Sequence, residues 1–307
     1  MVRGFFVGSG VAGLQHPSTT SHLLSFFPPS PPPTVAYLGT ATYDLPGPRL
    51  LQTKGLAAAG CRILDVAVCA AASYDAAAAR RALEAADIII VSGGNTLHAY
   101  DRWCATGVAA QLRAAAARGA VLSGGSAGAI CWFDGGHSDS ADADTYRGAM
   151  LAADTEDEHK EHGEGDERKP WSYLRVPCLG ILPGLVCPHA DATQSNGVLR
   201  MEDFDEMMAR HEGERGIAID HWCALKVDGE EYEVVPLPDK PGSEAADGGW
   251  VADRSGLPAV WIKEVVGGRV ETALAPKRGK LADLVRKGEI VQDPRLDACR
   301  AENPSDP

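Results

Sequence analysis

Short apolar runs alternate with longer runs that suit a helix from residue 34 to residue 130. The apolar runs are "TVAYLGTA" at 34–41, "CRILDVAV" at 61–68, "IIIVSGGNT" at 88–96 and "AVLSGGSAG" at 120–128. The runs between them, such as the alanine-rich "YDAAAARRALEAAD", favour helices by propensity. Strands that alternate with helices are typical of a mostly parallel sheet covered on both faces. The pattern therefore predicts an α/β fold of the doubly wound kind.

Further strand signals lie on either side of this region. Residues 3–10, "RGFFVGSG", read as a first strand with a glycine turn, and not as part of a signal peptide. The stretch near 27–33 is rich in proline and predicts a loop. Strand signals return in "CLGILPGLVCPHA", "RGIAIDHWCALKV", "EYEVVPL" and "AVWIKEVV". We therefore expect a single α/β domain over residues 1–270.

Two segments are expected to lie outside the regular fold. Residues 151–170 are charged and nearly free of large apolar side chains, which is typical of a solvated insertion. His159, Glu161 and His162 in this stretch are also metal-ligand types, but the insertion is the interpretation that we favour. Residues 271–307 are interpreted as a C-terminal extension that is partly disordered.

The composition excludes several classes of protein. A formal net charge of −13 argues against nucleic-acid binding, which rests on Lys and Arg neutralising phosphates. No apolar run reaches the roughly 18 to 20 residues that a membrane helix needs. The eight cysteines have neither C-x-x-C nor metal-site spacing, and they read as buried free thiols in a reducing compartment. We therefore expect a cytoplasmic protein with no nucleic-acid or membrane partner.

The stretch Gly124-Gly125-Ser126-Ala127-Gly128 fits the pattern G-x-S-x-G. In that pattern the serine lies on a tight strand-to-helix turn, flanked by glycines because neighbouring backbone passes close. The apolar run before Ser126 and the helix-compatible "AICWF" after it give the expected context. Ser126 is therefore a candidate nucleophile, although the same residues also suit a plain turn.

A serine hydroxyl needs a base, and the base needs an orienting acid. His189 follows the apolar run "LPGLVC", where a sheet would deliver its side chain to the carboxyl edge. Asp220, at the end of "GIAID", and Asp139, shortly after the serine block, compete as the acid. Gly93, Gly94 and the amide of Ala127 are candidates for binding an oxyanion.

These blocks in this order, "SGGNT", "GGSAGAICWF" with "SDS", "LPGLVCPH" and "GIAID", resemble the peptidase E family of aspartyl dipeptidases. The family is related to cyanophycinases, and the resemblance covers roughly residues 35–230. It implies a flavodoxin-like fold akin to class I glutamine amidotransferases. It also implies Ser126 as nucleophile, His189 as base and Asp220 as acid, with Asp139 as the alternate acid.

The resemblance further implies residues that bind substrate. Arg200, in "GVLR", falls where the family uses an arginine for the substrate's acidic side chain, and a guanidinium suits a carboxylate. Asn95, in the "SGGNT" block, is expected to lie in the substrate site as well.

The resulting hypothesis is a serine peptidase that hydrolyses dipeptides or short peptides, including those with N-terminal Asp, through an acyl-enzyme. No metal or organic cofactor is implied, and the sequence is compatible with a homodimer. One alternative is an α/β-hydrolase esterase, whose usual order puts a late histidine after the acid, but no histidine follows His221 here. The other is a non-catalytic binding or regulatory protein that kept the fold.

Overall fold

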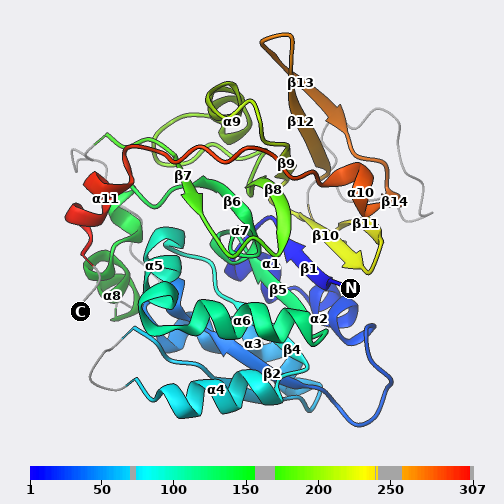
Figure 1. Ribbon diagram of the computed structural model, residues 1–307. Coiled ribbons are helices and arrows are strands. Elements are labelled where there is room, and N and C mark those ends of the chain that lie inside the picture. The colour runs from blue at the N-terminus through cyan, green and yellow to red at the C-terminus, as the bar shows by residue number, and fades with distance from the viewer. Residues whose placement is uncertain (70–73, 156–169, 239, 241–257, 305–307) are drawn as a thin grey trace.

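Two β-sheets with helices packed around them form the structure, a computed structural model that describes residues 1–69, 74–155, 170–238, 240 and 258–304 (Figure 1). From edge to edge, the larger sheet contains β14 (Arg278–Lys280), β11 (Glu231–Pro236), β10 (Cys223–Asp228), β1 (Arg3–Val7), β5 (Val121–Gly125), β4 (Ile88–Val91), β2 (Thr34–Leu38) and β3 (Arg62–Asp65). The smaller sheet contains β13 (Arg269–Leu274), β12 (Val260–Val266), β9 (Gly216–Ile219), β8 (Leu182–Cys187), β6 (Phe133–Ser138) and β7 (Leu174–Pro177).

Helices precede and follow these strands along the chain. They are α1 (Val11–Leu14), α2 (Pro17–Leu24), α3 (Pro46–Ala58), α4 (Ala76–Ala85), α5 (Thr96–Thr106), α6 (Val108–Ala117), α7 (Ala127–Ile130), α8 (Arg147–Thr155), α9 (Arg200–Arg210), α10 (Leu281–Leu284) and α11 (Leu296–Glu302). Short 3₁₀ turns lie at Thr40–Thr42 and Ala143–Thr145.

The strands β1, β5, β4, β2 and β3 are parallel, as the alternating sequence predicts. Every residue of β4 is buried, and its side chains divide between the two faces. Ile89 and Val91 pack in the core cluster that includes residues of α4, α5 and α6. Ile88 and Ile90 pack in the cluster that includes residues of α1, α2 and α3. The parallel strands are therefore covered on both faces.

Antiparallel strands extend the larger sheet beyond β1. β10 pairs with β1, β11 with β10 and β14 with β11, all antiparallel. In the smaller sheet β6, β8 and β9 are parallel, whereas β7, β12 and β13 are added antiparallel. The mixed α/β class with parallel strands is confirmed. The chain departs from the expected single, mostly parallel sheet, because antiparallel strands are added in its second half beside the parallel pair β8 and β9, which α9 connects.

The smaller sheet lies against the same core as α4 to α6. Val186 of β8 points into that core cluster, while Leu185 and Cys187 point to the opposite face, which α9 covers through Phe204 and Met208. The carboxyl ends of β8 and β9 are thereby fixed relative to those of β1 and β5.

The C-terminal residues return to both sheets. β13 belongs to the smaller sheet and β14 to the larger one. Leu284, Leu296 and Cys299 are buried in the main core cluster, so residues up to 304 include ordered, packed structure. The boundary at residue 270 stays a prediction. Of the charged stretch 151–170, residues 156–169 lie outside the described residues, and so do His159, Glu161 and His162. In the parts of the chain that the structure describes, no helix is long and apolar enough to cross a membrane.

Candidate active site

Ser126 lies on a sharp turn between the end of β5 and the start of α7. Its φ of 54° and ψ of −119° are unusual for a residue with a side chain, and its amide donates to the Val7 carbonyl at 3.1 Å. The residue is 8% exposed. The strained backbone presents the hydroxyl at the carboxyl edge of the sheet, next to the N-terminus of α7, as the G-x-S-x-G pattern predicts.

Close backbone contacts explain the glycines around Ser126. A Cβ on Gly124 would lie 2.3 Å from the carbonyl oxygen of Gly128. On Gly125 it would lie 2.2 Å from the carbonyl oxygen of Ser9, and on Gly128 it would lie 2.1 Å from that of Val91. No side chain fits at these distances, so the turn can form only with glycine at all three positions.

Two other glycines border the space beside the Ser126 side chain. A Cβ on Gly93 would lie 3.6 Å from the Ser126 Cβ, and one on Gly10 would lie 3.7 Å from it. Gly93 was predicted as part of the site. Gly10 was not, although its signal was present, because "GSG" follows a strand that ends at the same edge of the sheet.

The predicted oxyanion residues Gly94 and Ala127 lie in the loops that meet here. Gly94 has a φ of +114°, and a Cβ on it would lie 2.2 Å from the carbonyl oxygen of Ala41. Ala127 is the first residue of α7. Within the described part of the chain, the amides of Gly93, Gly94 and Ala127 donate to no protein acceptor. Of these amides, that of Ala127 directly follows Ser126, and Gly93 lies beside the Ser126 Cβ.

His189 is fixed next to the same strand end. It follows β8, has a φ of +51°, and its amide donates to the Gly8 carbonyl at 3.1 Å. The Ser126 amide donates to the carbonyl of Val7, the residue that precedes Gly8 in the chain. Two adjacent peptide groups after β1 therefore position the backbones of the candidate nucleophile and the candidate base.

The imidazole of His189 contacts a second histidine. Its Nδ1 lies 2.7 Å from Nδ1 of His221, and the ring centroids are 4.8 Å apart. Among the described residues, His221 is the hydrogen-bond partner of the His189 ring. His221 was not predicted as a site residue.

Burial sets the charge of this pair. Although His189 retains partial exposure, the protein packed around its ring lowers the pKa well below its usual value, and the positive charge of Arg200 lowers it further. Burial also lowers the pKa of His221, against a smaller opposing effect of Asp191. Both imidazoles are therefore neutral at pH 7, and a neutral His189 is the form that can accept a proton.

Asp220, the first candidate for the acid, is 4% exposed, and its carboxylate bonds to residues at the start of β12. It accepts a hydrogen bond from the Ala259 amide at 2.7 Å and faces the Trp261 Nε1 at 3.2 and 3.3 Å. The structure therefore does not bring this carboxylate to the His189 ring.

Asp139 and Arg200 meet in a buried cluster that borders the loop after His189. Arg200 Nη1 lies 3.5 Å from Asp139 Oδ2 and 2.8 Å from Gln194 Oε1, and its Nη2 donates to the His137 carbonyl at 2.6 Å. The guanidinium also lies 4.9 Å from the Tyr173 ring centroid. The Arg200 side chain is 1% exposed, and its charge is already partly balanced by Asp139.

Asn95 has a structural role that its position explains. It is the N-cap of α5, where its Oδ1 accepts a hydrogen bond from the His98 amide at 2.9 Å. Its Nδ2 donates to the Ser140 carbonyl at 3.1 Å and to the Thr145 hydroxyl at 2.8 Å. With 1% exposure, Asn95 connects the loop after β4 to the loop after β6.

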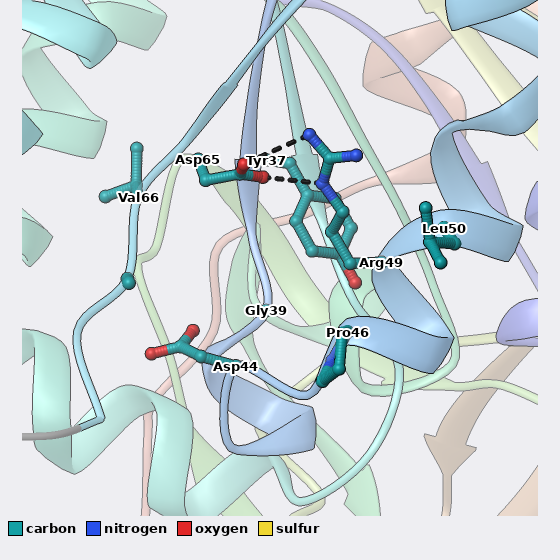
Figure 2. Close-up of a pocket in the computed structure, with 9 residues that line it drawn as sticks. Tyr37, Gly39, Asp44, Pro46, Arg49, Leu50, Asp65 and Val66 are labelled. Carbon is teal, nitrogen blue, oxygen red and sulfur yellow. Dashed lines mark hydrogen bonds and ion pairs between the residues drawn. The ribbon is translucent and has the colours of Figure 1, made fainter. Parts of the chain in front are cut away.

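A separate hollow of about 380 Å³ opens where β2 and β3 end (Figure 2). Arg49 and Asp65 form a two-point ion pair at 2.8 and 3.0 Å along one side of it. Asp44 accepts hydrogen bonds from two backbone amides, those of Val68 and Cys69, each at 2.7 Å. None of the predicted catalytic residues lines this hollow.

Comparisons with known proteins agree with this architecture. The sequence profile of peptidase family S51 matches residues 7–235. A relative from Trypanosoma brucei brucei, named G2/mitotic-specific cyclin-1, is 33% identical over 318 aligned residues, which cover 95% of this chain and 91% of that protein. An uncharacterized peptidase of Bacillus subtilis strain 168, YgaJ, is 35% identical over 105 aligned residues, 34% of this chain and 33% of its own.

Two solved structures share the fold. A peptidase E protein from Listeria monocytogenes EGD-e superposes with a TM-score of 0.52 at 17% identity, covering 77% of this chain and 99% of its own. A peptidase from an acI-B1 Actinobacterium gives 0.53 at 15% identity, covering 91% of this chain and 97% of its own. Together with the profile match over most of the chain, these findings establish that the chain belongs to peptidase family S51, the peptidase E family, and is a serine-type peptidase.

Proposed function

We propose that the chain hydrolyses dipeptides and short peptides through an acyl-enzyme, with Ser126 as nucleophile and His189 as base. The observation that carries the proposal is the pair of hydrogen bonds from the Ser126 and His189 amides to the consecutive carbonyls of Val7 and Gly8. They hold a strained serine and a neutral imidazole at one edge of the sheet, as acyl transfer requires.

The proposed reaction uses these groups in two steps. His189 takes the hydroxyl proton while the Ser126 oxygen attacks the peptide carbonyl, and the amides of Gly94 and Ala127 bind the negative oxygen that forms. His189 then gives the proton to the leaving amine as the C–N bond breaks. A water molecule, deprotonated by His189, attacks the resulting ester and releases the acid product and Ser126.

A preference for N-terminal Asp is proposed through the charge of Arg200. Arg200 is close enough to His189 to lower its pKa, so a substrate carboxylate near the base would experience the same positive charge. Because Arg200 already contacts Gln194 and Asp139, the preference rests on replacing one of these partners. We expect it to be modest, about tenfold over an uncharged residue.

The finer fold assignment also belongs to this proposal. The order β3-β2-β4-β5-β1 matches the flavodoxin-like order 2-1-3-4-5 when β1 takes the place of the fifth strand. This supports a flavodoxin-like half resembling class I glutamine amidotransferases, to which the smaller sheet is added. A cytoplasmic location and a homodimer remain parts of the proposal.

The direct test is a panel of dipeptides incubated with the purified full-length chain and with a Ser126→Ala variant. Release of free amino acids by the wild-type chain alone supports the proposal, and the preferred N-terminal residue shows whether the chain selects for Asp. Hydrolysis of aryl esters without any peptide hydrolysis would favour the esterase alternative. No turnover of either would favour a non-catalytic protein.

A further inference from the structure

The His189 ring faces another imidazole at the position where a serine hydrolase usually has a carboxylate. Nδ1 of His189 and Nδ1 of His221 are 2.7 Å apart, a distance that requires one shared proton between two neutral rings. If both nitrogens carried a proton they would repel each other, and if neither did, two lone pairs would face each other.

The direction of this hydrogen bond follows from the role of His189, and so rests on the proposed function. A base that accepts the Ser126 proton on Nε2 must carry its own proton on Nδ1. Nδ1 of His189 is then the donor and Nδ1 of His221 the acceptor, which leaves the His221 proton on Nε2.

We propose that His221, instead of Asp220 or Asp139, is the positioning residue that orients His189 and fixes its tautomer. The site then consists of a serine and two histidines, with a neutral acceptor in place of an anion. Asp220 is left to hold the strand region that contains Ala259 and Trp261.

Contacts on both sides hold His221 in this orientation. Its backbone amide donates to Asp191 Oδ1 at 2.6 Å, and Asp191 lies in the loop that begins with His189. Its ring packs edge-on against Trp222, with centroids 4.5 Å apart. The two loops that carry the histidines are therefore tied together by backbone and by side chain.

Burial favours two neutral rings, because it lowers the pKa of both histidines. The positive charge of Arg200 lowers the pKa of His189 further, whereas at His221 Asp191 raises the pKa and Lys240 lowers it by a smaller amount. A neutral acceptor stabilises the imidazolium that forms during the reaction less than a carboxylate would. The acid limb of the pH profile is the pH range in which kcat/KM falls as the pH is lowered, and for the wild-type chain we expect it well below pH 6.5. We also expect a lower kcat than a carboxylate would support.

Substitutions at His221 test this assignment with kcat, KM and the pH profile. His221→Phe keeps a ring but removes the acceptor, and we expect kcat to fall about 10- to 100-fold at nearly constant KM, less than the roughly 10⁴-fold that loss of a triad carboxylate costs. His221→Gln restores an acceptor oxygen and should recover at least half of that loss on a logarithmic scale. His221→Glu supplies an anion, which should move the acid limb up by about one pH unit or more.

A matched control is His22→Phe, since His22 is a partly buried histidine stacked on Phe5 away from the site. It should leave kcat and the acid limb unchanged. Wild-type kcat and acid limb in His221→Phe would overturn the assignment while the peptidase proposal stands. A lower kcat together with a downward shift of the acid limb in Asp220→Asn would overturn it as well, because that result would make Asp220 the acid.

Nitrogen-15 NMR of the histidine rings provides a test that needs no substrate and is independent of how well the variants fold. The expected result at pH 7.5 is His189 protonated on Nδ1 and His221 protonated on Nε2, with a proton shared across the two Nδ1 atoms. His189 protonated on Nε2 would contradict the inference. Failure of the peptidase proposal itself would appear separately, as absence of turnover in the wild-type chain.

Discussion

A side chain on Gly10 would meet Ser126, because a Cβ added to Gly10 would lie 3.7 Å from the Ser126 Cβ. Gly10 has a φ of −72° and a ψ of −110°, so its substitution tests access to the serine, with thermal unfolding reporting any effect on the backbone. The loop after β1 thus lies next to Gly93 on the same side of Ser126, since a Cβ on Gly93 would lie 3.2 Å from the Gly10 Cα.

The first prediction concerns this loop. Gly10→Val should fold, but its methyl groups would reach over the Ser126 hydroxyl and lower kcat/KM by about tenfold or more. Gly10→Ala adds a single carbon at an ordinary contact distance and should lower it much less. Peptide turnover and thermal unfolding of both variants provide the measurement, and equal activity of Gly10→Val and wild type would contradict the geometry.

The second prediction concerns the strand-to-helix turn. Gly128→Ala places a Cβ 2.1 Å from the Val91 carbonyl oxygen, so the turn must shift, and we expect a loss of at least about 2 kcal/mol in the free energy of unfolding. The matched control is Gly148→Ala in α8, where a Cβ meets nothing within 4 Å. The control should be unchanged or stabilised by up to about 1 kcal/mol. Urea unfolding of both variants measures the difference, and equal unfolding midpoints would contradict the prediction.

The third prediction concerns a buried ion pair between β7 and the loop before β9. Arg175 donates to both oxygens of Glu214 at 2.9 and 2.8 Å, with exposed fractions of 0% and 2%. Glu214→Gln leaves a buried guanidinium without its carboxylate and should cost about 3–5 kcal/mol. Glu231→Gln breaks a solvent-exposed pair with Lys280 and should leave the urea midpoint unchanged. Similar midpoints for the two variants would refute the prediction.

The fourth prediction is a loss of stability at mildly acidic pH. Burial lowers the pKa of His137 to about 3, and Asp203 accepts its hydrogen bond at 2.7 Å. Since an unfolded histidine titrates near pH 6.5, unfolding takes up a proton between about pH 6.5 and 3, and stability falls as the pH falls through this range. This one group contributes up to about 1.4 kcal/mol per pH unit.

Urea unfolding at pH 7.0, 6.0 and 5.5 measures that slope before most carboxylates titrate. His137→Phe retains a ring between Tyr173 and Phe204 and should reduce the slope. Identical slopes in the variant and the wild-type chain would show that His137 is not the source.

Local patterns were sufficient to predict much of the fold and part of the site. The parallel strands and the glycines around Ser126 follow from short segments whose backbone constraints are local. Two further features have local signals in the sequence. Gly267 and Gly268, both with positive φ, join β12 to β13 as a tight hairpin, and an asparagine before a helical run is a typical N-cap, as Asn95 proves to be.

Other features depend on contacts between distant segments and carry no local signature. The carboxylate of Asp220, the expected acid, bonds to Ala259 and Trp261, and the ring of the next residue, His221, contacts the His189 ring instead. The path of the loop after β9 determines which of these two adjacent residues contacts His189. Likewise, the enclosure of Arg200 by Asp139 and Gln194 arises from three loops that meet only in the folded chain.

Covalent labelling of the serine tests the central claim most directly. The purified chain is treated with a fluorophosphonate, and the modified residue is located by mass spectrometry of peptides, with Ser126→Ala as the control. The account predicts one stoichiometric adduct on Ser126, formed more slowly when His189 is replaced by Gln, and none in the control. Peptide hydrolysis by Ser126→Ala at the wild-type rate, or an adduct on a different serine, would contradict it.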